Sequence, residues 1–324
     1  MARRAWLAGP ALAATFLAVF TAHAGELPKL DLPVACAIGE QCFVQNYVDH
    51  DAGPGFGDYT CGSLSFDRHT GTDFTLVDRA PDVEPVAVLA AADGRVKTVG
   101  SPPKTASQLH WTQPGHHVVI DHGGGWTTLY AHMAPGSVIV DAGATVVAGE
   151  RIGTIGNSGE ARFDHLHFEV QHHGAVVDPF SGTGPGIICG VSLASLWSGA
   201  AAEVLAYRPT GLLGHGFAGD LIRDGATPAP AMPDAATIVF WADLFGLRPG
   251  DRVEARLLAP DGRILAAEPT ELDTVAARLL TQAGYHRPES GWPVGEYRGS
   301  VTLMRPGTDG WQIITDAELT LHIP

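Results

Sequence analysis

Two short segments of the chain carry histidine and aspartate at spacings that suit a metal site. Residues 66–74 read FDRHTGTDF, so that His69 and Asp73 lie four positions apart with a glycine between them. If the chain bends there, both side chains reach one ion, and imidazole nitrogen and carboxylate oxygen are both good zinc ligands. An ordinary surface turn has the same spacing, so this segment alone leaves both interpretations open.

The second segment carries a pair of histidines on a predicted strand. Residues 164–170 read DHLHFEV, and alternate residues of a strand point to the same face. His165 and His167 therefore face one space, whereas Leu166, Phe168 and Val170 face a core. Two imidazoles side by side are seldom needed for packing, which favours a metal or catalytic role, although one His-x-His pair does not decide the matter.

A third segment adds one more histidine. Residues 127–132 read TTLYAH and are predicted to form a strand, with Tyr130 and His132 on one face. Simple packing of His132 is the alternative. The sequence has no His-Glu-x-x-His motif, which excludes a thermolysin-type site with a glutamate base.

Four segments together resemble the lysostaphin/LytM-type metalloendopeptidases. They are HTGTD at 69–73, GHHVVIDHGGGWTTLYAH at 115–132, VVAGERIGTIGNSG at 146–159 and HLHFE at 165–169, and the likeness spans about residues 60–185. The resemblance implies a compact antiparallel β core with the site in a groove, and hydrolysis of peptidoglycan peptide bonds. It assigns one zinc ion to His69, Asp73 and His167, and it assigns catalysis to His132 and His165.

Three protein ligands leave the fourth position of zinc open, which is typical of a catalytic site and not of a structural one. The two remaining imidazoles, His132 and His165, then position or deprotonate water and stabilise the oxyanion or protonate the leaving amine. The expected enzyme is a zinc endopeptidase acting on peptidoglycan stems or cross-links, with the direct cross-link between D-Ala and a diamino acid preferred. A catalytically silent LytM-like scaffold or activator of another hydrolase is the alternative, although all five polar residues are present. A disulfide-stabilised carbohydrate-binding module would leave those five residues unexplained.

Charge and the N-terminus indicate where the protein acts. The 324 residues carry a formal net charge of −15, which argues against nucleic acid as a partner because phosphate binding needs a basic surface. Residues 1–24 read as a signal peptide, with Arg3 and Arg4, an apolar run and an Ala-His-Ala cleavage site. We expect a periplasmic or secreted protein with no membrane span after cleavage, and an uncleaved anchor is the alternative.

Four cysteines fit an oxidising compartment. The expected disulfides are Cys36–Cys42, a local loop, and Cys61–Cys189, a long-range link. Four cysteines allow three pairings, and free buried thiols are the alternative. No Cys-x-x-Cys pair is present, so a cysteine zinc site is not expected.

The turn signals are spaced by about ten residues, which is typical of an antiparallel all-β fold. We divide the chain into a signal peptide (1–24), an N-terminal loop region with a disulfide (25–60), a LytM-like peptidase domain (61–190), a linker (191–234) and a β-sandwich-like domain (235–324). One helix is predicted near 271–283. The last domain carries no motif with chemistry, and it is expected to bind the wall, contact a protein partner, or shield the groove.

The remaining histidines have ordinary interpretations. The tandem pairs His116–His117 and His172–His173 place one ring on each face of a strand, and His122 precedes a glycine turn. Surface exposure or local hydrogen bonding is expected for the four paired histidines, and a structural role is expected for His122.

Overall fold

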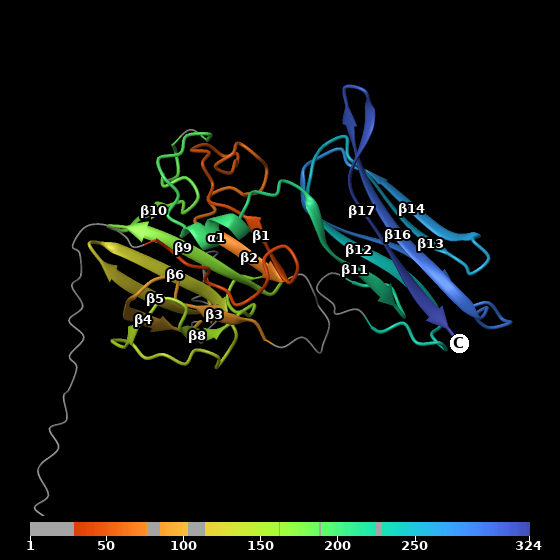
Figure 1. Cartoon of the computed structure of the whole chain (residues 1–324), viewed down its shortest axis with the longest axis horizontal. Helices are drawn as coiled ribbons and strands as arrows, with labels where there is room; N and C mark the ends of the chain where they lie inside the picture. The colour runs from red at the N-terminus through yellow and green to blue at the C-terminus, as the bar shows by residue number, and fades with distance from the viewer. Residues whose placement is uncertain (1–28, 77–84, 103–113, 162, 188, 224–228) are drawn as a thin grey trace, which may run out of the picture.

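The computed structural model describes residues 29–76, 85–102, 114–161, 163–187, 189–223 and 229–324. The predicted signal peptide, residues 1–24, lies outside these ranges. The described residues form antiparallel sheets and one short helix, α1 (Gly199–Val204), which confirms the predicted all-β class (Figure 1). None of the helices in the described ranges is long and apolar enough to cross a bilayer.

The N-terminal domain is built on one large antiparallel sheet. Its strands lie in the order β1-β2-β9-β6-β5-β4-β7, and β10 pairs with β9 beyond this path. A separate two-stranded sheet pairs β3 with β8. The strands are β1 (Cys42–Asn46), β2 (Thr72–Leu76), β3 (Ala87–Leu89), β4 (Gly94–Gly100), β5 (His116–Gly123), β6 (Trp126–Met133), β7 (Thr145–Val146), β8 (Arg151–Thr154), β9 (His165–His172) and β10 (Ala175–Val177).

The alternation in β9 decides which face of this sheet is the core. Leu166, Phe168 and Val170 are at most 1% exposed and pack with Phe74 and Tyr130 from the neighbouring strands. The opposite face of β9 carries His165 and His167, as expected from the sequence. Burial of one face of a central strand therefore presents the histidines on the other.

Both predicted disulfides are present, Cys36–Cys42 and Cys61–Cys189. The second one joins positions 128 residues apart and ties the loop before β2 to the segment after β10.

The C-terminal domain consists of two antiparallel sheets packed face to face. The first has the order β11-β12-β15 and the second β14-β13-β16-β17. Fully buried Phe240, Leu257, Tyr297 and Leu303 belong to the core between them, which confirms the predicted β-sandwich-like architecture. The strands are β11 (Gly211–Ala218), β12 (Thr237–Leu247), β13 (Arg252–Leu258), β14 (Ile264–Glu271), β15 (Ala276–His286), β16 (Gly295–Gly307) and β17 (Gly310–Ile323).

The helix predicted near 271–283 is wrong, because most of this segment is strand β15. It pairs with β12 from Thr237 opposite His286 to Leu247 opposite Ala276. Alternate residues Thr281 and Ala283 are buried. The segment has three alanines and three leucines, which favour helix, but pairing with the fully buried strand β12 outweighs that weak preference.

The two domains share a packed boundary. Phe43 of β1 lies against Phe245 of β12, with ring centroids 5.7 Å apart, and Phe245 and Leu213 belong to the core of the N-terminal domain. The chain between the domains is held as well, because the Tyr207 hydroxyl donates to Asp58 at 2.7 Å and the Thr210 hydroxyl donates to the Gly246 carbonyl at 2.7 Å. Segment 191–234 therefore contains α1, β11 and several contacts to both domains.

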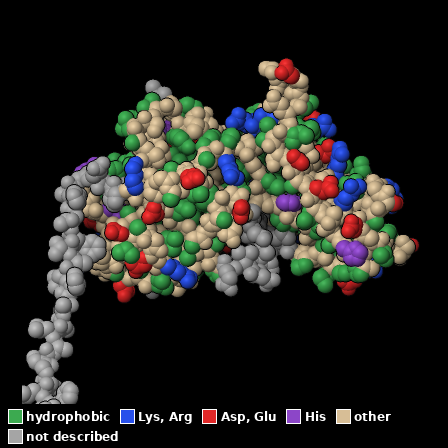
Figure 2. Space-filling model, viewed as in Figure 1, with side chains coloured by type: hydrophobic (Ala, Val, Ile, Leu, Met, Phe, Trp, Pro, Cys, Tyr) green, Lys and Arg blue, Asp and Glu red, His purple; other side chains and the backbone are tan. Residues whose placement is uncertain are grey.

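Charged side chains of both signs are interspersed over the face of the molecule seen in Figure 2. Local arrangements of charge, and not a broad field of one sign, therefore dominate the electrostatics of that face.

Candidate metal centre and active site

Three side chains converge on one point at the face of the large sheet. His69 comes from the turn before β2, Asp73 from β2 and His167 from β9. His69 Nε2 lies 3.1 Å from Asp73 Oδ1, His167 Nδ1 lies 3.0 Å from the same oxygen, and the two nitrogens are 3.2 Å apart. Among the described residues, these three side chains form a group that could hold a metal ion.

Strand register and one glycine bring the three groups together. Asp73 is directly opposite His167 in the β2–β9 pair, so their side chains point to the same face. Gly71 lies under the ring of His167: a Cβ placed on it would be 2.7 Å from His167 Nε2 and 2.7 Å from the Phe168 carbonyl oxygen. Glycine is the residue that leaves room for this ring.

The donor set fits a divalent cation. His69 donates its Nδ1–H to the Tyr47 carbonyl at 2.7 Å, which leaves a bare lone pair on Nε2 toward the centre. The Asn46 amide donates to Asp73 Oδ2 at 3.1 Å, so Oδ1 is the oxygen turned toward the histidines. Lone pairs at such separations repel one another unless a cation lies among them. Two nitrogens and one carboxylate oxygen match the ligand chemistry of zinc.

The electrostatics of the centre favour positive charge. Burial alone raises the pKa of Asp73, but the neighbouring His69 and His165 outweigh it and hold this pKa well below its usual value. Burial lowers the pKa of His167, but its hydrogen bonds to Asp73 and Glu169 raise it to about 9 in the metal-free protein. Two carboxylates thus attract a cation to this point, whether it is a proton or a metal ion.

Two further imidazoles flank the centre. His165 and His132 lie with ring centroids 4.7 Å apart, and the His132 ring is 5.9 Å from that of His167. His165 donates Nδ1–H to the Phe163 carbonyl at 2.9 Å, and its Nε2 lies 3.9 Å from Asp73 Oδ1. His132 donates Nδ1–H to the Ser158 carbonyl at 2.8 Å. In both rings the neutral tautomer therefore presents a free Nε2 acceptor.

The prediction that Tyr130 and His132 share a face of β6 is wrong. Tyr130 is fully buried in the core with its hydroxyl accepting from the Ala91 amide, whereas His132 turns to the site. The cause is a backbone φ of 61° at His132, together with a register shift in the pairing of β5 with β6, which reverses the alternation. A left-handed conformation is costly for a residue other than glycine, and such strain is concentrated at functional sites.

His132 is kept neutral by its surroundings. Burial and the neighbouring His165 both disfavour the imidazolium and lower the pKa of His132 to about 4, although the Ser158 carbonyl acts in the opposite direction. A neutral ring with a free Nε2 at pH 7 can accept a proton.

Sequence comparison agrees with this geometry. Residues 67–179, which include all five of these polar residues, match the model of Peptidase family M23. These residues form a peptidase family M23 domain.

Curated relatives are similar to part of this chain. An uncharacterized metalloprotease of Haemophilus influenzae is 35% identical over 39% of this chain and 23% of its own length. The cell division protein DipM of Caulobacter vibrioides is 33% identical over 34% of this chain and 16% of its own. The peptidoglycan DD-endopeptidase ShyA of Vibrio cholerae is 33% identical over 34% and 22%. The chain thus spans about a quarter or less of each relative.

Several residues that support the candidate site were not singled out from the sequence. Glu169 had a usable signal: it follows His167 by two positions on the same strand face, and its Oε2 lies 3.7 Å from His167 Nε2. Asn46 and the Tyr47 carbonyl had none, because they are brought to Asp73 and His69 only by the pairing of β1 with β2.

The other histidines have local partners. His122 bonds the Asp93 carbonyl at 2.7 Å and the Thr128 hydroxyl at 2.8 Å, and His172 stacks on Trp126 with centroids 4.1 Å apart. Neither pair involves the five residues of the site.

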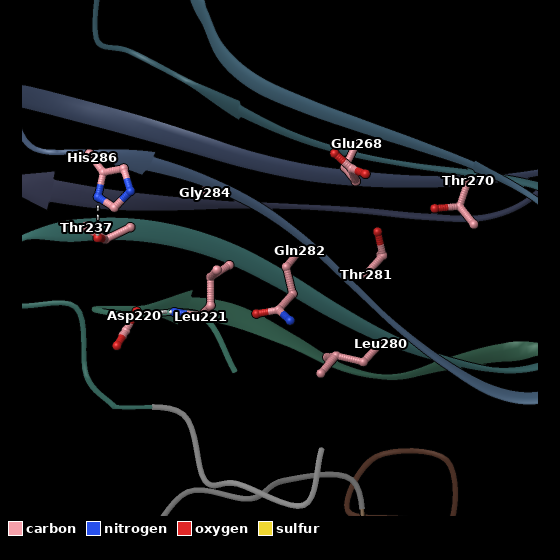
Figure 3. Close-up of a pocket in the computed structure, with 10 residues that line it drawn as sticks. All are labelled: Asp220, Leu221, Thr237, Glu268, Thr270, Leu280, Thr281, Gln282, Gly284 and His286. Carbon is pink, nitrogen blue, oxygen red and sulfur yellow. Dashed lines mark hydrogen bonds between the residues drawn. The ribbon is translucent and has the colours of Figure 1, made fainter. Parts of the chain in front are cut away.

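A separate hollow of about 490 Å³ lies in the C-terminal domain (Figure 3). None of the five residues of the candidate site lines it. Its lining comes from β14, β15, the start of β12 and the loop after β11: Asp220, Leu221, Thr237, Glu268, Thr270, Leu280, Thr281, Gln282, Gly284 and His286.

Proposed function

We propose that this chain is a zinc-dependent endopeptidase that hydrolyses peptide bonds in the stems or cross-links of bacterial peptidoglycan. The observation that carries the proposal is the convergence of His69, Asp73 and His167 next to two further imidazoles, those of His132 and His165. The M23 match and the relatives named as a metalloprotease and a peptidoglycan DD-endopeptidase support it.

In this proposal His69, Asp73 and His167 hold the zinc. When bound, zinc supplies a Lewis acid that polarises a peptide carbonyl and acidifies water. The Tyr47 carbonyl and the Asn46 amide fix the orientation of the ligands from behind, as the outer partners of metal ligands commonly do.

His132 and His165 are the proposed catalytic residues. Each has its Nδ1–H committed to a backbone carbonyl, so each offers Nε2 as the reactive atom. One ring takes a proton from the attacking water and, once protonated, can donate to the oxyanion or to the departing amine. The neutral state of His132 keeps it ready to accept a proton at pH 7.

We place the protein outside the cytoplasm, in the periplasm or secreted. The two disulfides support this, since such bonds persist in oxidising compartments. The peptide bond we favour is the direct cross-link between D-Ala and a diamino acid, in keeping with a relative named as a DD-endopeptidase. Mass spectrometry of the products from defined muropeptides identifies the bond.

A second candidate is a LytM-like scaffold or activator without catalysis of its own. One relative is named as a cell division protein and not as a peptidase, which favours keeping this candidate. A scaffold does not require stoichiometric zinc, so the metal content of native protein separates the two functions.

The test uses His69→Ala and Asp73→Ala, with His173→Ala as a control at an exposed histidine of the same domain. We expect both site variants to lose bound zinc and the release of muropeptides from purified sacculi, and the control to retain both. Activity that survives both site substitutions would show that the metal assignment is wrong. A wild-type protein that binds zinc stoichiometrically but releases no muropeptide would favour the scaffold.

A further inference from the structure

The C-terminal domain contacts the peptidase site through an arginine of β15. The Arg278 guanidinium carbon lies 5.1 Å from the ring centroid of Phe163, a cation–π contact. Phe163 belongs to the loop that precedes β9: its carbonyl accepts the hydrogen bond from His165 Nδ1, and its ring centroid is 5.0 Å from that of His165. Arg278 therefore lies beside the loop that orients a proposed catalytic residue.

The packed boundary between the domains fixes the position of Arg278. In the β12–β15 pair Arg278 is directly opposite Phe245, the residue whose ring packs against Phe43 of the N-terminal domain. Side chains opposite one another in a sheet lie on the same face. The face of this sheet that carries Arg278 is thus the one that meets the peptidase domain.

Part of the guanidinium is already committed. Nε donates to both carboxylate oxygens of Asp243, at 2.8 and 2.9 Å, and Nη2 also donates to Asp243. The Asp243 side chain is 6% exposed, so this pairing neutralises a buried charge.

The outer edge of the same guanidinium has no protein acceptor among the described residues. A guanidinium has five N–H donors, and Asp243 occupies only the side that Nε and Nη2 share. The Arg278 side chain is 16% exposed, so solvent reaches it. Asp243 on one side and Phe163 on the other hold the group in place, which lowers the entropy cost of binding a further acceptor.

We propose that Arg278 binds a free carboxylate of the substrate peptide, so that the C-terminal domain supplies one wall of the substrate groove. The inference rests on the proposed function, because peptidoglycan stems carry free carboxylates on their acidic and diamino-acid residues. The Nη1 and Nη2 edge of an arginine matches a carboxylate with two parallel hydrogen bonds. In a chain of net charge −15, such a fixed local cation is what an anionic peptide requires.

The wall continues along β15. Leu280 and Gln282 follow Arg278 at alternate positions, on the same face of the strand, and both line the hollow shown in Figure 3. Gln282 is held there by two hydrogen bonds to Ile222, at 2.7 and 2.8 Å. In this proposal, the remainder of an extended substrate anchored at Arg278 runs along this face of β15.

The test compares two matched stem-peptide substrates, one with a free carboxylate and one with that carboxylate converted to its amide. For the wild-type protein we expect kcat/KM to favour the carboxylate on the order of 10- to 100-fold, the range for a hydrogen-bonded charge. Arg278→Met is expected to bring this ratio close to one, and Arg278→Lys to keep part of it, because a lysine retains the charge but not the fork. A preference that Arg278→Met leaves intact, or a wild type without preference, would overturn the proposal.

Arg256→Met is the matched control. Arg256 of β13 makes the same side-on pair, with Nε and Nη2 each 2.9 Å from the Glu254 carboxylate, but it lies on the other sheet of the sandwich. The carboxylate preference should survive in this variant. Because Arg278→Met leaves Asp243 buried without a partner, the double variant Asp243→Asn, Arg278→Met provides a version with neither charge, and its ratio should also be close to one.

A binding measurement separates failure of this inference from failure of the proposed function. Calorimetry with the uncleavable stem peptide, free and amidated, should show the same preference in the wild type and its loss in Arg278→Met. If the wild type hydrolyses neither substrate but keeps this binding preference, the enzyme proposal fails and the carboxylate site stands. If it hydrolyses both substrates without preference and binds them equally, the enzyme stands and the carboxylate site fails.

Discussion

Replacement of Gly71 by alanine should weaken zinc binding while the protein still folds. Gly71 lies between His69 and Asp73, two of the proposed metal ligands, and under the ring of the third, His167. Its backbone does not adopt a positive φ, so the substitution adds a methyl group without straining the turn. The effect is therefore a steric push on one ligand.

The structure sets the size of that push. The new Cβ would be 2.7 Å from His167 Nε2 and 2.7 Å from the Phe168 carbonyl oxygen, where ordinary contacts begin at 3.4 Å, so each of these contacts must open by about 0.7 Å. The Phe168 carbonyl belongs to the central strand β9, so a shift of the Gly71 backbone relieves that contact, and the His167 ring moves to relieve the other. Zinc sites tolerate about 0.2 Å in ligand distance. We therefore expect zinc affinity to fall about 10- to 100-fold, or about 1.4 to 2.7 kcal/mol.

The assay is competition for zinc with a chromophoric chelator, together with urea unfolding of the metal-free protein. Overpacking by one methyl group costs about 1–3 kcal/mol, so the metal-free variant should still fold. Gly199→Ala is the control, because a Cβ at Gly199 meets no atom within 4 Å and its φ is not positive. Zinc affinity in Gly71→Ala equal to that of the wild type would refute the placement of His167 as a ligand.

Three further predictions concern stability. Burial and His165 lower the pKa of His132 from 6.5 to about 4. As the pH falls, the unfolded chain therefore takes up the proton before the folded protein does. The free energy of unfolding should decrease by up to about 3 kcal/mol between pH 6.5 and about pH 4. In metal-free protein, His132→Asn should flatten this part of the curve in urea titrations, and an unchanged slope would contradict the neutral ring. Removal of the Cys61–Cys189 disulfide, which joins residues 128 positions apart, should lower the free energy of unfolding by about 5 kcal/mol. Removal of Cys36–Cys42, with a separation of 6, should lower it by about 2 kcal/mol. Unfolding of the two Cys→Ser double variants measures both effects. Phe245→Ala opens a cavity at the domain boundary and should lower the free energy of unfolding by about 3 kcal/mol in calorimetry; a loss under 1 kcal/mol would mean that the Phe43 contact contributes little.

The sequence was most informative where burial and strand period agree. The alternation in residues 165–170 placed two histidines opposite a run of apolar residues, and the structure has this arrangement. The disulfide pairings and the two-domain all-β architecture were also predicted correctly.

Predictions failed where a backbone detail or a distant partner decides the outcome. The alternation rule placed His132 and Tyr130 on the same strand face, because nothing in the sequence TTLYAH predicts a left-handed backbone conformation at His132. The helix predicted near 271–283 follows local propensity, whereas the fully buried strand β12 draws that segment into a sheet. The contact of Arg278 with Phe163 joins positions 115 residues apart in different domains, and no local pattern indicates it.

The Cys61–Cys189 disulfide has a consequence for what happens when a protease cuts the chain. All five polar residues of the site, from His69 to His167, lie within the covalent ring that this bond closes. A protease that cuts the ring once converts it into two pieces that stay joined through sulfur, so no site residue is released. In a compartment shared with other peptidases, a nicked molecule would therefore keep its complete set of site residues, and only a second cut within the ring, or reduction of the bond, would allow part of it to leave.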